Sequence, residues 1–181
     1  MNKVVNFYNF DNNKDIIKMV FAIALTVCTN KPRKIAINSK TLFNSLSVKE
    51  NEFYNVRKYF TILNSDEITP NNSLFNYSFI ISALPAKCDI LICTYDLEKS
   101  DFKKIKSSFT NCFRKKTKTY ILLINYDRKY IKVYSEIAKT YDNIQLFSFS
   151  KDDMSKLDIE KLINEKMPLS NWMLKMIKKI N

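Results

Sequence analysis

The stretch KVVNFYNFDNNKDIIKMVFAIAL, residues 3–25, contains three segments with different patterns of apolar side chains. Residues 3–9 are dominated by β-branched and aromatic side chains, which predicts a strand. Residues 9–15 (NFDNNKD) are a polar turn without glycine. Apolar side chains then recur at helical spacing, at Ile16, Val20, Ile23, Ala24 and Val27. The stretch therefore predicts a strand, a tight turn and an apolar helix, for which Asp11 or Asn12 is the expected cap.

The rest of the chain continues this alternation of strand-like and helix-like segments. Residues 77–84 and 88–95 are almost continuously apolar, as in parallel strands that are covered on both faces. The other predicted strands are residues 33–38, 58–63, 118–125 and 143–150, and the predicted helices are residues 40–46, 97–113, 131–141 and 151–166, the last capped by Ser150. The pattern predicts an α/β fold: an open, mostly parallel sheet of about seven strands with helices on both faces.

The chain is expected to form one domain, residues 1–167, followed by a short basic amphipathic helix, residues 168–181, that docks on it. The longest apolar run, Met19–Cys28, is too short to span a bilayer. No small-residue cleavage site follows it, so it is not expected to be a secretory signal. These features predict a cytoplasmic protein.

The composition excludes several kinds of active site. The 181 residues include no histidine and no glycine, and the net charge is +12. Without histidine, Ser-His-Asp sites, Cys-His sites and His-ligated metals are excluded. The four cysteines form no CxxC pair, which favours reduced core side chains, with structural zinc as the alternative. Without glycine, asparagine is the residue expected at positive φ. The positive charge fits AT-rich codon bias as well as attraction to nucleic acid or anionic lipid.

The order of these segments resembles that of the ParA/MinD-type partition ATPases, a deviant Walker group of P-loop proteins. Residues 3–25 are similar to the phosphate-loop unit of the family, and PRKIAINSK (32–40) looks like the strand that carries its acidic signature. Residues 75–105 (FNYSFIISALPAKCDILICTYDLEKSDFKKI) are similar to the Walker B strand and the proline turn, apolar strand and helix that follow it. Residues 120–129 (YILLINYDRK) look like the strand with the base-reading asparagine. The resemblance covers most of the chain and implies a P-loop NTPase-like fold.

The loop residues depart from the family pattern. The family's loop reads Lys-Gly-Gly-x-Gly-Lys-Thr, and Lys14 keeps the place of the phosphate lysine. The signature lysine, the three glycines and the magnesium-binding hydroxyl are replaced by Asn9, Phe10, Asp11, Asn13 and Asp15. The ring of Phe10 is expected to fill the space for the phosphate. Unless it turns away, the Asp11 carboxylate would repel each phosphate charge by about 4 kcal/mol at ~4 Å.

The positions at which the family binds magnesium also differ from the family pattern, whereas those that read the base are kept. Asn38 and Lys40 stand in place of the acidic signature, and Ser82 replaces the Walker B aspartate, so no carboxylate is expected to orient a magnesium ion. Asn125 and Asp127 remain at the base-reading position, with capping of the next helix as the alternative role. The sequence therefore predicts a degenerate nucleotide site with no cofactor and no metal.

These departures predict a catalytically inactive pseudo-ATPase that acts as a binding or scaffold module in DNA partition, positioning or assembly of a larger complex. The resemblance implies a protein partner, either a second copy of the chain or an active ATPase relative. Two alternatives stay open. One is an atypical nucleotide-dependent ATPase that uses Lys14 and Asn125, and the other is a non-specific DNA-binding protein with a basic surface.

Two surfaces are candidates for binding. A basic surface at the helix after residue 97 would contact DNA through Lys103, Lys104, Lys106, Arg114, Lys115, Lys116 and Lys118. The alternative is that these residues only face solvent and stabilise the C-terminal end of the helix through its dipole. The apolar residues of the C-terminal segment would pack on the sheet or on a partner protein, and the less favoured alternative is a membrane surface. These residues are Trp172, Met173, Met176, Ile177 and Ile180. Asp89 and Asp96 flank one predicted strand, and Asp127 ends the next. Asp96 and Asp127 are the acidic residues expected at ligand-binding strand ends, with capping as the default role of both.

Overall fold

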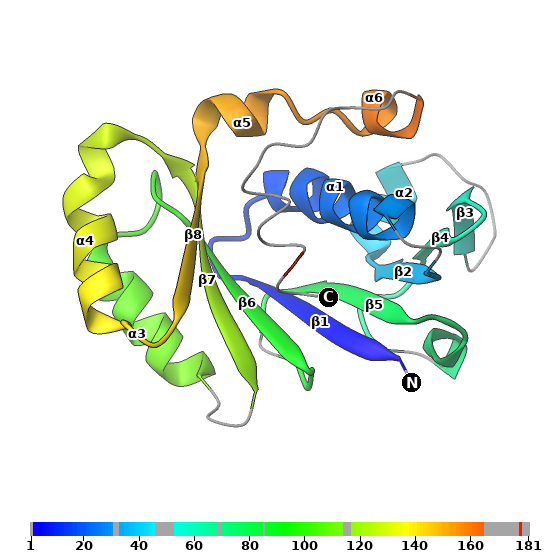
Figure 1. Ribbon diagram of the computed structural model, residues 1–181, viewed down its shortest axis with the longest axis horizontal. Coiled ribbons are helices and arrows are strands. Elements are labelled where there is room, and N and C mark those ends of the chain that lie inside the picture. Colours follow the sequence, from blue (N-terminus) through cyan, green and yellow to red (C-terminus); the bar gives the residue numbers. More distant parts are fainter. Residues whose placement is uncertain are drawn as a thin grey trace.

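A computed structural model describes residues 2–30, 33–45, 53–68, 70–84, 86–113, 117–164 and 178 of the chain. Its centre is an eight-stranded sheet in the order β3-β4-β2-β5-β1-β6-β7-β8 (Figure 1). Neighbouring strands are parallel except β3 and β4, which are antiparallel. The strands are β1 (Lys3–Asn9), β2 (Ile35–Asn38), β3 (Phe53–Arg57), β4 (Phe60–Leu63), β5 (Tyr77–Ser82), β6 (Ile90–Asp96), β7 (Lys118–Tyr126) and β8 (Gln145–Ser150).

Helices cover both faces of the sheet (Figure 1). On one face, α1, α2, α5 and α6 enclose the larger core, and on the other face α3 and α4 enclose a smaller one. The helices are α1 (Asp15–Asn30), α2 (Lys40–Ser45), α3 (Phe102–Cys112), α4 (Ile131–Thr140), α5 (Lys151–Ser155) and α6 (Ile159–Asn164), with 3₁₀ turns η1 (Pro70–Leu74) and η2 (Arg128–Tyr130). The predicted open α/β sheet with helices on both faces is confirmed.

β1 lies in the middle of the sheet, between β5 and β6, and its side chains alternate between the two cores. Val5 and Phe7 are buried in the larger core with α1, whereas Tyr8 belongs to the smaller core with α3. α1 is buried on nearly all sides because it contacts both the sheet and α6. A helix that is apolar around its whole circumference needs such a position. The strand and helix predicted from residues 3–25 are therefore confirmed.

Two details of the elements differ from the sequence prediction. The sheet has one strand more than expected, because β3 pairs with β4 at the edge, where a bulge between Asn55 and Arg57 interrupts the alternation that would identify a strand. The helix predicted for residues 151–166 is two helices, because Asp158 accepts the backbone N–H of Lys161 and starts α6. Ser150 does cap α5, as predicted, by accepting a backbone N–H of its first turn.

Within the part of the chain that the structure describes, no helix has the length and apolar character needed to cross a membrane. The C-terminal helix predicted for residues 168–181 lies outside the described residues, apart from Lys178. The division of the chain at residue 167 therefore stays a prediction.

Candidate functional site

The carboxyl ends of β1, β5, β6 and β7 meet at one edge of the sheet, where ligands bind in open α/β folds. Two depressions open at this edge. The loop cleft has a volume of about 660 Å³ and lies between the turn after β1 and the segments after β4 and β5. The β8 hollow has a volume of about 530 Å³ and lies between the ends of β7 and β8. Asn9, Asn13, Lys14 and Ser82 line the first, and Asn125 and Asp127 line the second.

The interior of the loop at residues 9–15 is filled by the side chain of Asn9. Its Oδ1 accepts the backbone N–H of Asn13 at 3.0 Å, and its Nδ2 donates to the carbonyl of Asn13 at 3.0 Å. Both residues are buried. A phosphate-binding loop turns such backbone N–H groups toward its ligand. Here the N–H of Asn13 donates to a side chain of the loop itself.

Asparagine takes the conformations for which other chains use glycine. Among the described residues, the non-glycine residues with positive φ are Asn12 at 49° and Asn125 at 57°. The backbone N–H of Asn12 donates to the carbonyl of Asn9 at 3.2 Å, which closes the turn after β1. The expectation that asparagine substitutes for the missing glycines is confirmed.

Helix α1 begins directly after this turn, and its cap is Asn13. The Oδ1 of Asn13 accepts the backbone N–H of Asp15 at 2.8 Å. The predicted caps, Asp11 and Asn12, are therefore wrong. Asp15 lies in the first turn of α1, where a carboxylate is favourable, and forms an ion pair with Lys18 at 3.3 Å.

Asp96, the last residue of β6, is a buried carboxyl group that connects three segments of this edge. Its side chain is 2% exposed. Oδ2 accepts Nδ2 of Asn13 at 2.8 Å, and Oδ1 accepts Nδ2 of Asn125 at 2.9 Å and the backbone N–H of Glu98 at 3.0 Å. The Nζ of Lys99 lies 3.9 Å from Oδ2. Both oxygens are thus occupied, so Asp96 joins the loop after β1 to the ends of β6 and β7.

Phe10 and Asp11 both point away from the loop cleft. The ring of Phe10 lies 5.7 Å from that of Tyr95, on the α3 side of the sheet. The Asp11 carboxylate accepts the backbone N–H of Asp96 and the hydroxyl of Ser100, each at 2.7 Å. The prediction that Phe10 fills the phosphate space is therefore wrong, and Asp11 takes the alternative in which it turns away. Asp11 thus holds the turn between β6 and α3, whereas Phe10 packs on aromatic rings of β1 and β6.

The loop cleft contains more negative than positive charge. Lys14 is exposed there, and the cleft is also lined by Asp66 and Glu67, which follow β4, and by the hydroxyls of Ser39 and Thr41. The sequence did not place these two carboxylates at the cleft, and the absence of a carboxylate that orients a magnesium ion stays a prediction. Nothing in the local sequence around residues 64–73 distinguishes it from a connecting loop, and only the pairing of β2 with β4 and β5 brings these carboxylates near β1.

Asn38 and Ser82 are engaged in internal hydrogen bonds. Asn38 is fully buried, exchanges hydrogen bonds with the side-chain amide of Asn72 and donates to the backbone carbonyl of Glu67 at 2.6 Å. Ser82 accepts Nδ2 of Asn6 at 2.7 Å and donates to a backbone carbonyl at 2.6 Å. These two positions therefore serve the packing of β2, β5 and η1.

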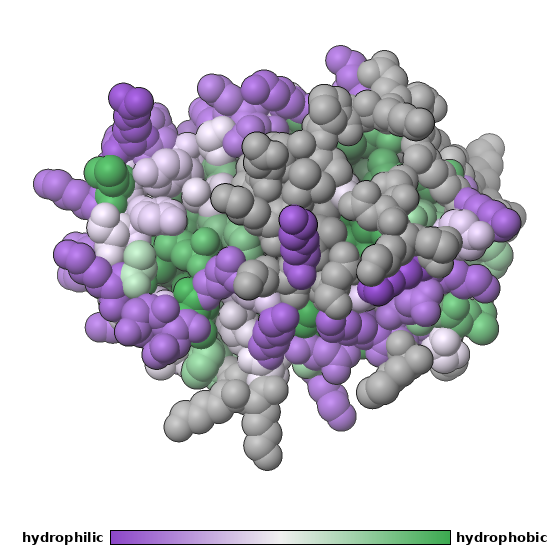
Figure 2. Space-filling model, in the orientation of Figure 1, coloured by the Kyte–Doolittle hydropathy of each residue, from purple (hydrophilic) through white to green (hydrophobic). Residues whose placement is uncertain are grey.

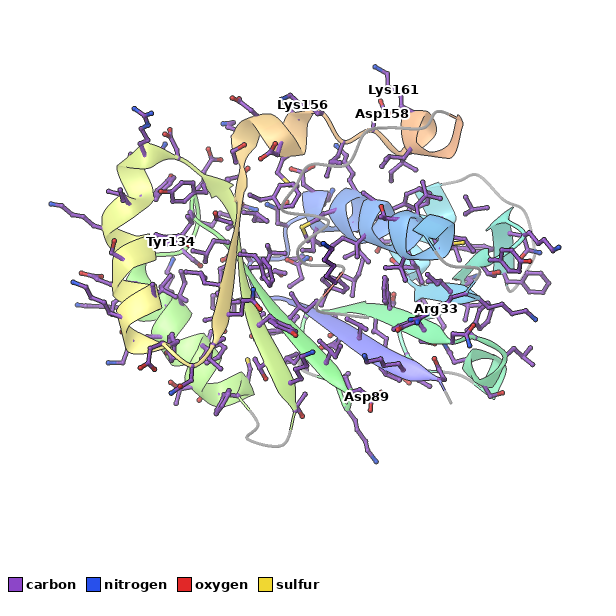
Figure 3. All side chains as sticks on the ribbon, viewed as in Figure 1. Arg33, Asp89, Tyr134, Lys156, Asp158 and Lys161 are labelled. Carbon is purple, nitrogen blue, oxygen red and sulfur yellow. The ribbon has the colours of Figure 1, made fainter. Side chains whose placement is uncertain are left out.

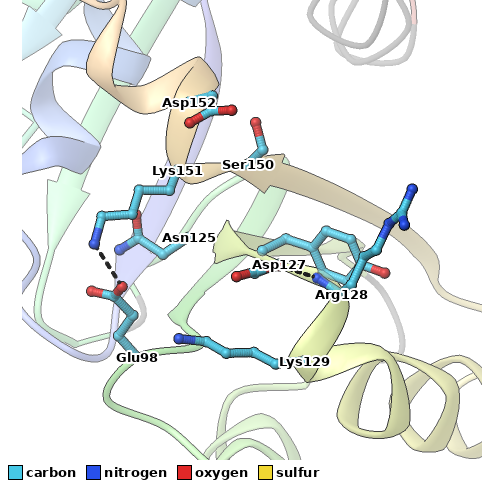
Figure 4. A pocket seen from close by; sticks show the side chains of 9 residues that line it. Glu98, Asn125, Asp127, Arg128, Lys129, Ser150, Lys151 and Asp152 are labelled. Carbon is cyan, nitrogen blue, oxygen red and sulfur yellow. Dashed lines mark hydrogen bonds and ion pairs between the residues drawn. The ribbon is translucent and has the colours of Figure 1, made fainter.

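In the β8 hollow, Asn125 and Asp127 also have partners within the chain (Figure 4). Asn125 donates to Asp96. Asp127 accepts the backbone N–H of Arg128 and caps η2. The capping alternative is therefore correct for Asp127, and the amide nitrogen of Asn125 is engaged by Asp96.

An ion pair lies beside the β8 hollow. The Nζ of Lys151 lies 3.0 Å from Oε1 of Glu98, so it joins the start of α5 to the turn after β6 (Figure 4). The hydrogen bond from Lys151 to Glu98 raises the pKa of this lysine above its ordinary value. The hollow thus presents mixed charges, because Arg128 and Lys129 line it together with Asp127 and Asp152.

The predicted basic surface is described in part. Lys103, Lys104 and Lys106 are exposed on α3, whose opposite side is buried in the smaller core, and Lys118 is exposed at the start of β7. The remaining residues of the two predicted surfaces lie outside the described part of the chain: Arg114, Lys115, Lys116, Trp172, Met173, Met176, Ile177 and Ile180. Their roles stay predictions.

The remaining reactive side chains serve the fold. Asp89, at the amino end of β6 (Figure 3), accepts the backbone N–H of Val4 at 2.7 Å. The cysteines form no disulfide bond with one another. Burial raises the pKa of Cys88 to about 11, and the hydrogen bond with Cys112 together with burial raises the pKa of Cys93. In the described segments, no three or more Cys, Asp or Glu residues are grouped to hold a metal ion. The prediction of reduced cysteines packed in the core is confirmed for Cys28, Cys93 and Cys112.

Comparison with known proteins adds information on the fold. No family model matches the sequence, and no curated protein matches it. The structure is similar to a plasmid partition protein from Borrelia burgdorferi, with a TM-score of 0.55, 13% identity, and coverage of 91% of this chain and 97% of the other. A second similar structure is a protein from Borrelia burgdorferi B31 that is designated a plasmid partition protein and was solved bound to AMPPNP. Its TM-score is 0.57 at 13% identity, and the match covers 99% of this chain and 97% of the other.

A third similar structure is the cell division protein MinD from Aquifex aeolicus, with a TM-score of 0.66 at 8% identity, covering 98% of this chain and 96% of MinD. At such low identities, similarity of structure shows the fold alone. The fold predicted from the sequence, the P-loop NTPase-like α/β fold of the ParA/MinD type, is confirmed.

Proposed function

We propose that this chain is a ParA/MinD-fold protein that works without a nucleotide, as a binding or scaffold module in DNA partition, positioning or assembly of a larger complex. The proposal rests on the loop after β1, in which Asn9 occupies both the N–H and the carbonyl of Asn13. A phosphate that used this N–H would have to displace a buried amide from two hydrogen bonds, each contributing about 0.5–1.5 kcal/mol.

The charges of the loop cleft support the same proposal. One cation, Lys14, shares the cleft with two carboxylates, those of Asp66 and Glu67. A carboxylate about 4 Å from a phosphate charge costs on the order of 4 kcal/mol at an effective dielectric constant of 20. The structural similarity to plasmid partition proteins and to MinD supports a role in partition or positioning, in which the chain would bind a protein partner.

Isothermal titration with ATP or GTP and magnesium tests the loss of nucleotide binding. We expect no saturable binding, which corresponds to a Kd weaker than about 1 mM. Binding in the micromolar range would overturn the proposal. Because the chain carries a net charge of +12, weak attraction of anions to its surface has to be separated from binding at the loop. Lys14→Ala would remove binding at the loop cleft, and Lys132→Ala, an exposed position on α4, would leave it unchanged.

A second candidate function is non-specific binding of duplex DNA through α3. The observation that favours it is the row of exposed lysines, Lys103, Lys104 and Lys106, on the side of α3 opposite to the core. Cations on the surface of a helix bind phosphates without reading bases, and they release condensed counterions as they do so.

Fluorescence anisotropy with a random duplex in a salt series tests this second function. We expect the triple substitution Lys103→Gln, Lys104→Gln and Lys106→Gln to reduce the slope of log K against log [salt] by about 2.7, or about 0.9 per lost phosphate contact. The control is Lys156→Gln with Lys161→Gln, at the end of α5 and on α6, which cover the opposite face (Figure 3). Losses in proportion to the charges removed, three in the test variant and two in the control, would show that only the net charge matters.

A further inference from the structure

Charge is distributed unequally between the two ends of the parallel strands. Around their carboxyl ends, the described residues include seven acidic and four basic side chains, in residues 9–14, 38–39, 63–68, 82–84, 96–101, 126–130 and 150. Around their amino ends they include six basic and two acidic side chains, in residues 2–3, 33–35, 58–60, 75–77, 86–90, 113, 117–118 and 141–145. The carboxyl end of the sheet is therefore negative in a chain whose net charge is +12.

Exposed apolar side chains gather at the same end. Among the described residues, six large apolar side chains are exposed, and five of them lie around the carboxyl ends of the parallel strands: Phe10, Phe53, Ile68, Leu84 and Ile131. Phe53 belongs to this group because it starts the antiparallel strand β3 and pairs with the last residue of β4. In the space-filling view, apolar groups reach the surface in separate patches between hydrophilic side chains (Figure 2). Exposed apolar side chains that gather in one place are typical of a surface that binds another protein.

The loop cleft combines the negative charge and the apolar surface in one place. Its apolar lining includes Ile17, Ile81 and Leu84, and Leu84 is 77% exposed. The side chains of Asp66 and Glu67 line the same cleft and are exposed. The ion pairs that form among the described residues use neither of these two carboxylates. The cleft thus presents an apolar surface beside carboxylates that are available to a cation.

We propose that the loop cleft binds a protein partner through a segment that is both basic and apolar. An apolar side chain of this segment would lie on Leu84, and a neighbouring lysine or arginine would pair with Glu67 or Asp66. The inference names the chemistry of the partner for the proposed scaffold role. It rests on that role, because a bound nucleotide would fill the same cleft.

Other occupants fit the cleft less well. An anion would meet two carboxylates and one cation, Lys14. For a metal ion, the described segments contain no group of three or more Cys, Asp or Glu residues. A second copy of the chain, joined symmetrically through this end of the sheet, would bring the same carboxylates together. A basic and apolar segment is the occupant that complements both the charge and the apolar surface.

The positive net charge of the chain does not prevent this contact. The seven residues of β6 place the two ends of the sheet roughly 20 Å apart, at about 3.3 Å per residue. The Debye length at physiological ionic strength is about 8 Å, so the cations at the amino end are largely screened at the cleft. The nearby carboxylates therefore set the local field, and binding of a basic segment should weaken as salt is added.

Selection from a library of short random peptides displayed on phage, with the full chain as the target, tests the proposal. The selected peptides are expected to contain lysine or arginine together with a large apolar residue. Synthetic copies of them should bind with a Kd on the order of 10 µM in fluorescence anisotropy. Their binding should weaken between about 150 and about 500 mM NaCl.

Two substitutions with matched controls locate the contact. Glu67→Lys should weaken binding of the selected peptides about tenfold, whereas Glu136→Lys, an exposed position on α4 with the same change of charge, should leave it unchanged. Leu84→Ser should also weaken binding about tenfold. Its control is Leu74→Ser, because Leu74 is 68% exposed and lies before the amino end of β5.

Hydrogen–deuterium exchange of the unmodified chain keeps the test independent of the folding of any variant. Amides of residues 64–68 and 82–84 should gain protection when a selected peptide is added, and those of residues 131–140 should not. The inference is overturned if no peptide binds with a Kd below about 1 mM, if the selected peptides lack basic residues, or if test and control variants lose binding equally. The nucleotide titration is decided separately: if ATP binds, the proposed function fails, and if neither ATP nor any peptide binds, this inference alone fails.

Discussion

Replacement of Asp96 by alanine is expected to lower the free energy of unfolding by about 3–5 kcal/mol. The carboxyl group is almost fully buried and accepts hydrogen bonds from Asn13, Asn125 and the backbone of Glu98. Its removal leaves these donors without their acceptor in a place that water reaches poorly, and each such donor costs about 1–3 kcal/mol before relaxation. Because total stabilities are about 5–15 kcal/mol, the loss is a large part of the whole.

Urea unfolding followed by circular dichroism measures this loss. The matched control is Asp101→Ala, five residues further on, which removes an exposed cap of α3 and should cost about 1 kcal/mol. If the two substitutions cost the same, Asp96 is no more than another cap, and the connection that it makes among three segments contributes nothing to stability.

Truncation of Phe7 to alanine is expected to cost about 3–5 kcal/mol, because it leaves a cavity at the centre of the larger core. Phe7 is fully buried on the middle strand, and its ring lies 5.9 Å from that of Phe79 on β5. The same truncation at Phe53, which is 49% exposed on the edge strand β3, should cost less than about 1 kcal/mol.

The measurement for Phe7→Ala is again the denaturant midpoint, compared at equal slope so that a change in compactness is not mistaken for a change in stability. A loss below about 1.5 kcal/mol would mean that α1 moves to fill the cavity, and that the packing of α1 on the sheet is less fixed than its burial suggests.

The elements that could be predicted from the sequence are those whose side chains are nearly all buried in the core, because their apolar pattern is then uninterrupted. β1 and α1 were predictable because residues 3–9 are rich in β-branched and aromatic side chains and the apolar residues from Ile16 onward keep helical spacing. β3 was missed because a bulge breaks its alternation, and the break between α5 and α6 was missed because Asp158 could equally have been a surface residue of one long helix. Local patterns carry no information about such choices, which depend on packing against α1 and β4.

The candidate site shows the same limit more strongly. The loss of the glycines and the use of asparagine at positive φ could be read directly from the sequence. The orientation of Phe10 and Asp11 and the carboxylates at positions 66 and 67 could not be predicted, because each depends on a contact between segments far apart in the chain. The closing of the loop by Asn9 is a local contact, but the pattern of residue types does not reveal which side chain of the turn makes it. Asp96 and Asn13, for example, are separated by 83 residues and meet only when β6 is placed beside β1.

The central place of β1 has a consequence for how the protein is made. Its two neighbours begin about 75 and 85 residues later, since Lys3 pairs with Tyr77 and Val5 with Ile90. During synthesis, the most apolar helix of the chain and the strand before it are complete long before their partners leave the ribosome. Pairings between such distant segments form slowly, and the waiting segments can associate with other chains. The N-terminal third of this protein is thus the part that is exposed longest to association with other chains before its own partners are made.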